Sequence, residues 1–82
     1  MKKVDIKLSL AENVKTFVNV VNHHAFDMDL RSGRHVVDAK SILGIFSLDL
    51  SRPITLEIDD EKNRDEAQLE ALLRDIETFT VK

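Results

Sequence analysis

The stretch KSILGIFSLDL, residues 40–50, decides how the rest of the chain can fold. Ser41 stands where it can cap a short helix, and Gly44 allows the backbone of that helix to pack closely against a neighbour. Pro53 breaks any helix soon afterwards, because proline also restricts the residue before it. The apolar residues are too dense for one face of one element: Ile42, Leu43, Ile45, Phe46, Leu48 and Leu50. The stretch therefore predicts a short helix that either buries or exposes several apolar side chains.

Alternating sequences on both sides of this stretch predict four strands. Apolar and polar residues alternate over residues 4–8, 26–30 and 54–58, which is the period of a strand buried on one face. A further strand is expected over residues 34–38. Ser32-Gly33 supplies a turn before it, since glycine readily adopts positive φ, so the two middle strands are expected to form a hairpin.

Two longer segments have the period of a helix. The first covers residues 10–22, and Ser9 with Glu12 has the spacing of a capping box at its start. The second begins at Asn63, which forms a capping pattern with Glu66. Its apolar stripe consists of Leu69, Leu72, Leu73, Ile76 and Phe79. The predicted order of elements is βαββαβα.

This order predicts a single α+β domain over residues 1–82. Strands with one polar face, beside two amphipathic helices, favour an open-faced two-layer sandwich with a four-stranded antiparallel sheet. The chain has no cysteine, so its stability has to come from apolar packing.

The composition argues against several classes of function. A net charge of −3, a pI of about 5.5 and the absence of Trp and Tyr disfavour a nucleic-acid-binding surface. No apolar run approaches the ~20 residues that cross a bilayer. Asp5 and Lys7 interrupt the first residues before a signal-peptide core can form. We therefore expect a cytoplasmic protein that binds neither nucleic acid nor a membrane.

Residues 38–48, DAKSILGIFSL, followed by a strand and an amphipathic C-terminal helix, resemble the HPr family of the bacterial sugar phosphotransferase system. Within them, KSILG at residues 40–44 matches the family's Lys-Ser-Ile-Met-Gly-like run except for Leu in place of Met. The resemblance covers nearly the whole chain. It implies an HPr-like fold, with the strands in the order 1-4-2-3 and the helices on one face of the sheet.

HPr proteins carry phosphate on a histidine at the first helix, within a Gly-Leu-His-Ala-Arg-Pro-like motif. Residues 8–13 of this chain, LSLAEN, stand at that place and contain no His, Arg or Pro. A phosphohistidine needs an imidazole nucleophile and nearby cationic or N–H groups, whereas Glu12 would oppose the charge of the phosphoryl group. We therefore expect a non-catalytic protein without the usual histidine phosphotransfer.

The serine of the middle motif is retained as Ser41. From the residues alone it is a helix cap worth about 1 kcal/mol. The resemblance implies a regulatory role, since a kinase phosphorylates this serine in HPr-like proteins of many Gram-positive bacteria, and the product binds a transcriptional regulator of carbon catabolite repression. A branch called Crh keeps the serine and lacks the phosphocarrier histidine. A phosphate on Ser41 would lie near free helix N–H groups, with Lys40 beside it.

Ile42, Leu43 and Phe46 are candidates for an exposed, partner-binding patch next to this serine. Core packing is the alternative for all three, and it is the expectation for Ile45, Leu48 and Leu50. For Leu43 and Phe46 the resemblance implies a surface that faces a partner, since family members dock through the equivalent run.

The three histidines are expected to be structural. His23 and His24 are neighbours at the end of the first helix, so they lack the i, i+4 spacing of a metal site, and the helix dipole favours a protonated ring there. His35 is expected to face solvent on the third strand. Asp59-Asp60-Glu61 is expected to form a solvated turn, because no twelve-residue calcium loop surrounds it. The sequence has no nucleophile triad, Gly-rich phosphate loop or zinc spacing, so we expect no cofactor and no metal.

Three hypotheses about function remain open. The first is a regulatory interaction module that an HPr-kinase-type enzyme controls at Ser41 and a transcriptional regulator recognises. The second is a phosphocarrier that uses one of the three histidines in an unorthodox place. The third is a structural role in which the sheet edge or residues 42–46 form oligomers. The sequence leaves the oligomeric state open.

Overall fold

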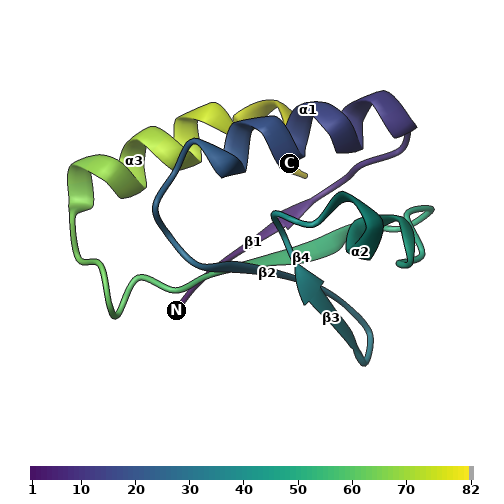
Figure 1. Ribbon diagram of the computed structural model, residues 1–82, viewed down its shortest axis with the longest axis horizontal. Coiled ribbons are helices and arrows are strands. Elements are labelled where there is room, and N and C mark those ends of the chain that lie inside the picture. The colour runs from purple at the N-terminus through teal and green to yellow at the C-terminus, as the bar shows by residue number, and fades with distance from the viewer. Residues whose placement is uncertain (82) are drawn as a thin grey trace.

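The computed structural model describes residues 1–81 and confirms the predicted order of elements (Figure 1). The elements are β1 (Lys2–Ile6), α1 (Ala11–Asn22), β2 (Met28–Ser32), β3 (His35–Asp38), α2 (Ile42–Phe46), β4 (Ile54–Ile58) and α3 (Glu66–Asp75), followed by a short 3-10 helix, η1 (Glu77–Phe79). None of the helices in this part of the chain is long and apolar enough to cross a membrane.

The four strands form one antiparallel sheet in the order β1-β4-β2-β3, as the resemblance implied. β4 lies between β1 and β2, so the last strand of the sequence occupies a central place. α1 and α3 form a layer over one face of the sheet (Figure 1). The short helix α2 packs against α1 and β3. The predicted open-faced two-layer α+β architecture is therefore confirmed.

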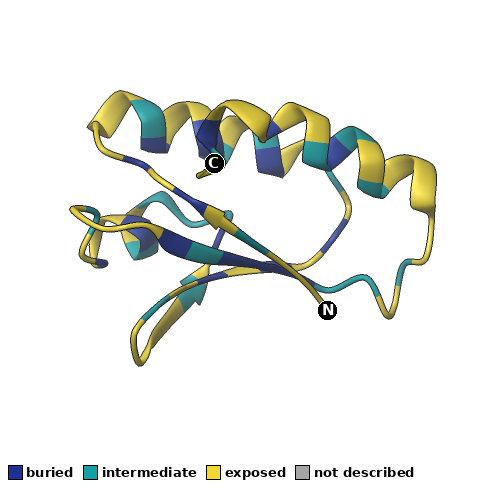
Figure 2. Cartoon of the chain, turned by 180° about the vertical axis from the view of Figure 1, so that it is seen from behind, coloured by how far each residue is buried: buried dark blue, intermediate teal, exposed yellow. Residues whose placement is uncertain are grey.

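The buried residues of the sheet and of the helices lie where the two layers face each other (Figure 2). The core is formed there by apolar side chains of the strands and of α1 and α3. Phe17 of α1 and Phe79 of η1 meet edge to face with their ring centroids 5.5 Å apart, which is a favourable geometry for an aromatic pair. The buried apolar residues are Ile6, Leu8, Val14, Phe17, Val21, Phe26, Met28, Leu30, Ala39, Ile45, Leu48, Ile54, Leu56, Ile58, Leu72, Ile76 and Phe79.

The predicted capping box of the first helix is wrong by one residue. Leu10 is the N-cap residue, and its backbone N–H donates to Oδ1 of Asn13 at 3.1 Å. Ser9 makes no side-chain cap, because α1 begins at Ala11 and the extended residue before it is Leu10. The N-terminus of α1 is therefore capped by the amide side chain of Asn13, which belongs to the first turn of the same helix.

The start of the last helix also differs from the prediction. Asp65, not Asn63, is the N-cap residue, and its Oδ1 accepts hydrogen bonds from the N–H groups of Ala67 and Gln68 at 3.1 and 3.2 Å. A carboxylate accepts two backbone donors at once and is favoured by the helix dipole. Asn63 lies in the loop before it, where its Oδ1 accepts the N–H of Asp65.

β4 covers the predicted residues 54–58, whereas the boundaries of the other three strands shift by one or two residues from the sequence expectation. β2 begins at Met28, whereas Phe26 is a buried core residue of the preceding loop. The C-terminal segment after α3 returns to β1: Lys7 N–H donates to Phe79 O at 2.8 Å, and Val81 N–H donates to Asp5 O at 2.9 Å. These two hydrogen bonds hold the C-terminal segment against β1, the edge strand of the sheet.

Candidate functional site

Ser41 caps α2 as the sequence predicted. Its Oγ accepts the N–H of Gly44 at 3.2 Å, and its own N–H donates to the carbonyl oxygen of Asp38 at 3.0 Å. Ser41 is partly buried, and its hydroxyl is bound to the first turn of the helix. Ser41 therefore has a fixed position at the junction of β3 and α2.

Gly44 is needed where α2 meets the sheet. A Cβ added at this position would lie 3.2 Å from Cβ of Val37 and 3.3 Å from Oγ of Ser41. These contacts are tighter than ordinary van der Waals contact, so a side chain here would press on the strand and on the capping hydroxyl. The glycine is what allows α2 to approach β3 while Ser41 stays in place.

Lys40 is not a free cation beside Ser41. Its Nζ donates to the carbonyl oxygen of His24 at 2.8 Å, and its backbone N–H donates to Oδ1 of Asp38 at 2.9 Å. The ammonium group thus sits at the C-terminal end of α1, where exposed carbonyl groups favour a positive charge. The sequence placed Lys40 next to Ser41 but gave no signal for this long-range contact.

Leu43 and Phe46 are exposed, and we call this pair of residues the α2 patch. Leu43 is 80% exposed and Phe46 is 45% exposed, while Ile42 is half-buried against the core. Ile45 of the same helix is fully buried. The helix therefore divides its apolar residues between a buried side and an exposed side.

Leu10 is a further exposed apolar residue, and the sequence does not single it out because it falls within the predicted helix over residues 10–22. It is 62% exposed as the N-cap residue of α1. The beginning of α1 and α2 lie at the same end of the molecule (Figure 1). Exposed apolar side chains from two separate elements are therefore present at this end.

The three histidines lie away from the first turn of α1. His23 Nδ1 donates to the carbonyl oxygen of Asn19 at 2.6 Å, and His24 Nε2 lies 2.9 Å from Oδ2 of Asp75. His35 is exposed at the start of β3. Among residues 1–81, no polar contact joins any of these rings to the first turn of α1. The described residues also include no cluster of three or more His, Asp or Glu side chains that could hold a metal ion.

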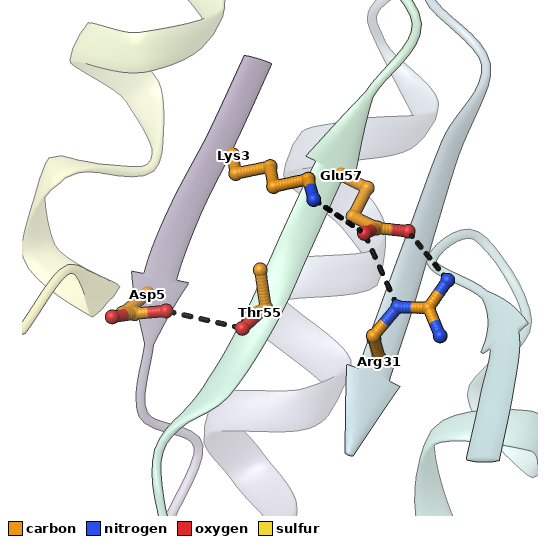
Figure 3. A network of polar contacts seen from close by, with 5 residues as sticks. All are labelled: Lys3, Asp5, Arg31, Thr55 and Glu57. Carbon is orange, nitrogen blue, oxygen red and sulfur yellow. Dashed lines mark hydrogen bonds and ion pairs between the residues drawn. The ribbon is translucent and has the colours of Figure 1, made fainter. Parts of the chain in front are cut away.

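Glu57 is the one charged residue that is buried in the described structure, and it lies on the face of the sheet opposite α1 and α3 (Figure 3). It is 6% exposed. Arg31 donates to it through Nε at 3.2 Å and through Nη2 at 3.4 Å, and Nζ of Lys3 lies 3.7 Å away. The hydrogen bond from Arg31 holds the pKa of Glu57 below its ordinary value. The strand alternation predicted an exposed residue at this position.

A family model described as "PTS-HPr: PTS HPr component phosphorylation site" matches residues 9–78. The chain belongs to the HPr family. The matched region includes both α1 and the α2 segment with Ser41. A comparison with curated proteins gives no significant match.

Two solved HPr structures resemble this member of the family along nearly its full length. The crystal structure of HPr-C-His from Thermoanaerobacter tengcongensis has a TM-score of 0.69 and 30% identity, and the alignment covers 95% of this chain and 93% of that one. The phosphocarrier protein HPr from Bacillus anthracis str. Ames has a TM-score of 0.56 and 31% identity, with 90% and 92% coverage. The present chain therefore has the HPr fold while its residues 8–13 contain no histidine.

Proposed function

We propose that this HPr-family protein is a regulatory interaction module, related to the sugar phosphotransferase system and controlled by phosphorylation of Ser41. In this proposal the usual histidine phosphotransfer is absent, and Lys40, Ile42, Leu43 and Phe46 form the surface that a partner binds. The observation that carries the proposal is the position of Ser41: a partly buried N-cap residue at the start of α2, the helix that carries the exposed α2 patch.

The local geometry supports a switch at this serine. Phosphorylation transfers the γ-phosphoryl group of ATP to Oγ of Ser41, so that a new O–P bond forms, the bond to ADP breaks and the hydroxyl proton leaves. The product carries about −2 charge next to an apolar patch. A partner with an apolar pocket beside a cationic group would distinguish the phosphorylated protein from the unmodified one.

The environment of the first helix supports the absence of the usual phosphocarrier activity. Glu12 is the acidic residue of the first turn of α1, where relatives have their phosphohistidine motif. A carboxylate at this place would repel a phosphoryl donor. The rings of His23 and His24 are instead bound to Asn19 and Asp75.

The test is incubation of the protein with a bifunctional HPr kinase and ATP, followed by intact-mass measurement and peptide mapping. We expect one added phosphate on Ser41 and none on the S41A variant. S47A is the matched control, because Ser47 is an exposed serine at the other end of α2, and it should be phosphorylated like the unmodified protein. Failure of the kinase to add phosphate to Ser41 would remove the regulatory proposal.

A second reaction separates the regulatory module from an unorthodox phosphocarrier. The protein is incubated with phosphoenolpyruvate and the general first enzyme of the phosphotransferase system. We expect no acid-labile phosphate. A phosphate mapped to His23, His24 or His35 would contradict the proposed loss of histidine phosphotransfer.

A further inference from the structure

A hollow of about 480 Å³ lies where the β2–β3 hairpin meets the start of β4. Its lining includes Arg31 at the end of β2, Arg34 and His35 of the hairpin, and Arg52 before β4. These residues come from two segments that are separated by α2 in the sequence. The volume lies within the range of small-molecule binding sites.

The charge of this hollow is opposite to that of the whole protein. The chain carries a net charge of −3, yet three of its five arginines line this one place. Asp49 is the single acidic residue of the lining. Its Oδ1 already accepts two hydrogen bonds from Ser51, one from the backbone N–H at 3.1 Å and one from the hydroxyl at 2.6 Å, and these bonds lower its pKa.

Arg31 is held in position by the buried carboxylate on the open face of the sheet. Glu57 accepts hydrogen bonds from Nε and Nη2 of this guanidinium. The remaining terminal nitrogen points away from Glu57 (Figure 3). Because two of its donors are already fixed, Arg31 would lose little conformational freedom when its last nitrogen donates to a ligand.

Arg34 and Arg52 are the available cations of the site. Within residues 1–81, neither side chain makes a hydrogen bond to or an ion pair with another residue. The hairpin that carries Arg34 turns through Gly33, whose φ is +60°, and Ser32 pairs with His35 across the turn. Such a turn is short and well defined, so the position of the Arg34 backbone is fixed relative to β2.

We propose that this arginine hollow binds a small phosphorylated molecule that carries at least two negative charges. Guanidinium groups donate paired N–H groups in a geometry that matches phosphate oxygens. Two unpaired guanidinium groups, with the last nitrogen of Arg31, suit a di- or polyphosphate better than a singly charged carboxylate. The site is independent of the proposed function, since it lies at the hairpin end of β3 whereas Ser41 follows the other end.

The probe is inorganic pyrophosphate, titrated into the full chain and followed by calorimetry and by amide chemical shifts. We expect saturable binding, with the largest shifts at Gly33, Arg34 and Arg52. The double variant R34A/R52A should weaken binding at least about tenfold, because each hydrogen bond between charged groups contributes more than a neutral one. A thermal unfolding scan of the variant shows whether it is folded.

The matched control is R64A/R74A, which removes the same charge from arginines outside the hollow. It should change pyrophosphate affinity by less than about twofold, the effect of net charge alone. An equal loss in both double variants would overturn the proposal, as would sulfate binding as tightly as pyrophosphate at equal ionic strength. Absence of saturable binding to the unmodified protein would also overturn it.

Discussion

The two ends of β3 carry opposite kinds of surface. After its C-terminal end, Ser41 is followed by the apolar α2 patch, and before its N-terminal end lies the arginine hollow. The α2 patch consists of residues close together in the sequence. The hollow is assembled from β2, the hairpin and the start of β4, which only the fold brings together. A surface of the first kind can be predicted from sequence, and one of the second kind cannot.

The largest effect that we predict compares the two sides of α2. Ile45→Ala should lower the free energy of unfolding by about 3 kcal/mol, because it leaves a cavity at a fully buried position. Leu43→Ala should lower it by less than about 0.5 kcal/mol, because Leu43 faces solvent. Urea unfolding followed by circular dichroism measures both. Similar losses in the two variants would show that Leu43 is part of the core and not of a binding patch.

The second prediction tests whether the two surfaces act separately. Leu43→Asp should slow phosphorylation of Ser41 by the HPr kinase about thirtyfold, which corresponds to about 2 kcal/mol and is typical of a central apolar contact. It should leave pyrophosphate binding unchanged. The R34A/R52A variant should show the reverse pattern, with an unchanged rate of phosphorylation. If either variant impairs both properties, the two ends of β3 are coupled.

The apolar surface after β3 could be predicted in part from the sequence alone. The density of apolar residues in 42–46 indicated a helix that either exposes some of them or buries them all, and the resemblance implied exposure of Leu43 and Phe46, which are indeed exposed. The strand alternation and the helical stripes predicted the core and the order of elements. The capping side chains could not be distinguished, since Ser9, Asn13 and Asp65 all have suitable neighbours and only the packing decides among them.

The parts that could not be predicted depend on strand order. Glu57 occupies a polar position of an alternating strand, which predicts exposure. It is buried because the order β1-β4-β2 places Lys3 and Arg31 on either side of it, with Lys3 and Asp29 directly opposite in the register. The same strand order brings Arg31 close to Arg52. Arg31 is far in the sequence from both Glu57 and Arg52, so local sequence patterns carry no information about either pair.

The third prediction concerns the carboxylate that positions Arg31. Glu57→Gln should lower the free energy of unfolding at pH 7 by about 1 kcal/mol, since Arg31 is partly exposed and the ion pair is weakened by solvent. The pKa of Glu57 is lower in the folded protein than in the unfolded chain. Its stabilisation is therefore complete above the ordinary pKa of glutamate and is lost as the pH falls through the folded value.

Urea unfolding at pH 7 and pH 2.5 measures this contribution. The difference in the free energy of unfolding between the unmodified protein and E57Q should be smaller at pH 2.5 than at pH 7. Glu70→Gln is the control, because Glu70 is exposed on α3, and it should be nearly neutral at both values. A difference for E57Q that is the same at both pH values would mean that the contact acts through packing and not through its charge.

The smallest predicted effect has the opposite sign and comes from the neighbouring strand. Asp29 lies opposite Glu57 in the register, and the pKa of its carboxyl is raised by burial and by the nearby Asp38. The ionised form therefore destabilises the fold at neutral pH, and this penalty vanishes as the pH falls below the ordinary pKa of aspartate. Because Asp29 is exposed, solvent screens these charges, so Asp29→Asn should stabilise the protein at pH 7 by no more than about 0.5 kcal/mol and have no effect near pH 2.5. Destabilisation at pH 7 would show that Asp29 makes a favourable contact. If E57Q destabilises the protein and Asp29→Asn stabilises it, then of two neighbouring carboxylates on the open face of the sheet, Glu57 stabilises the fold and Asp29 destabilises it. The reason is that Arg31 forms hydrogen bonds with Glu57 and not with Asp29.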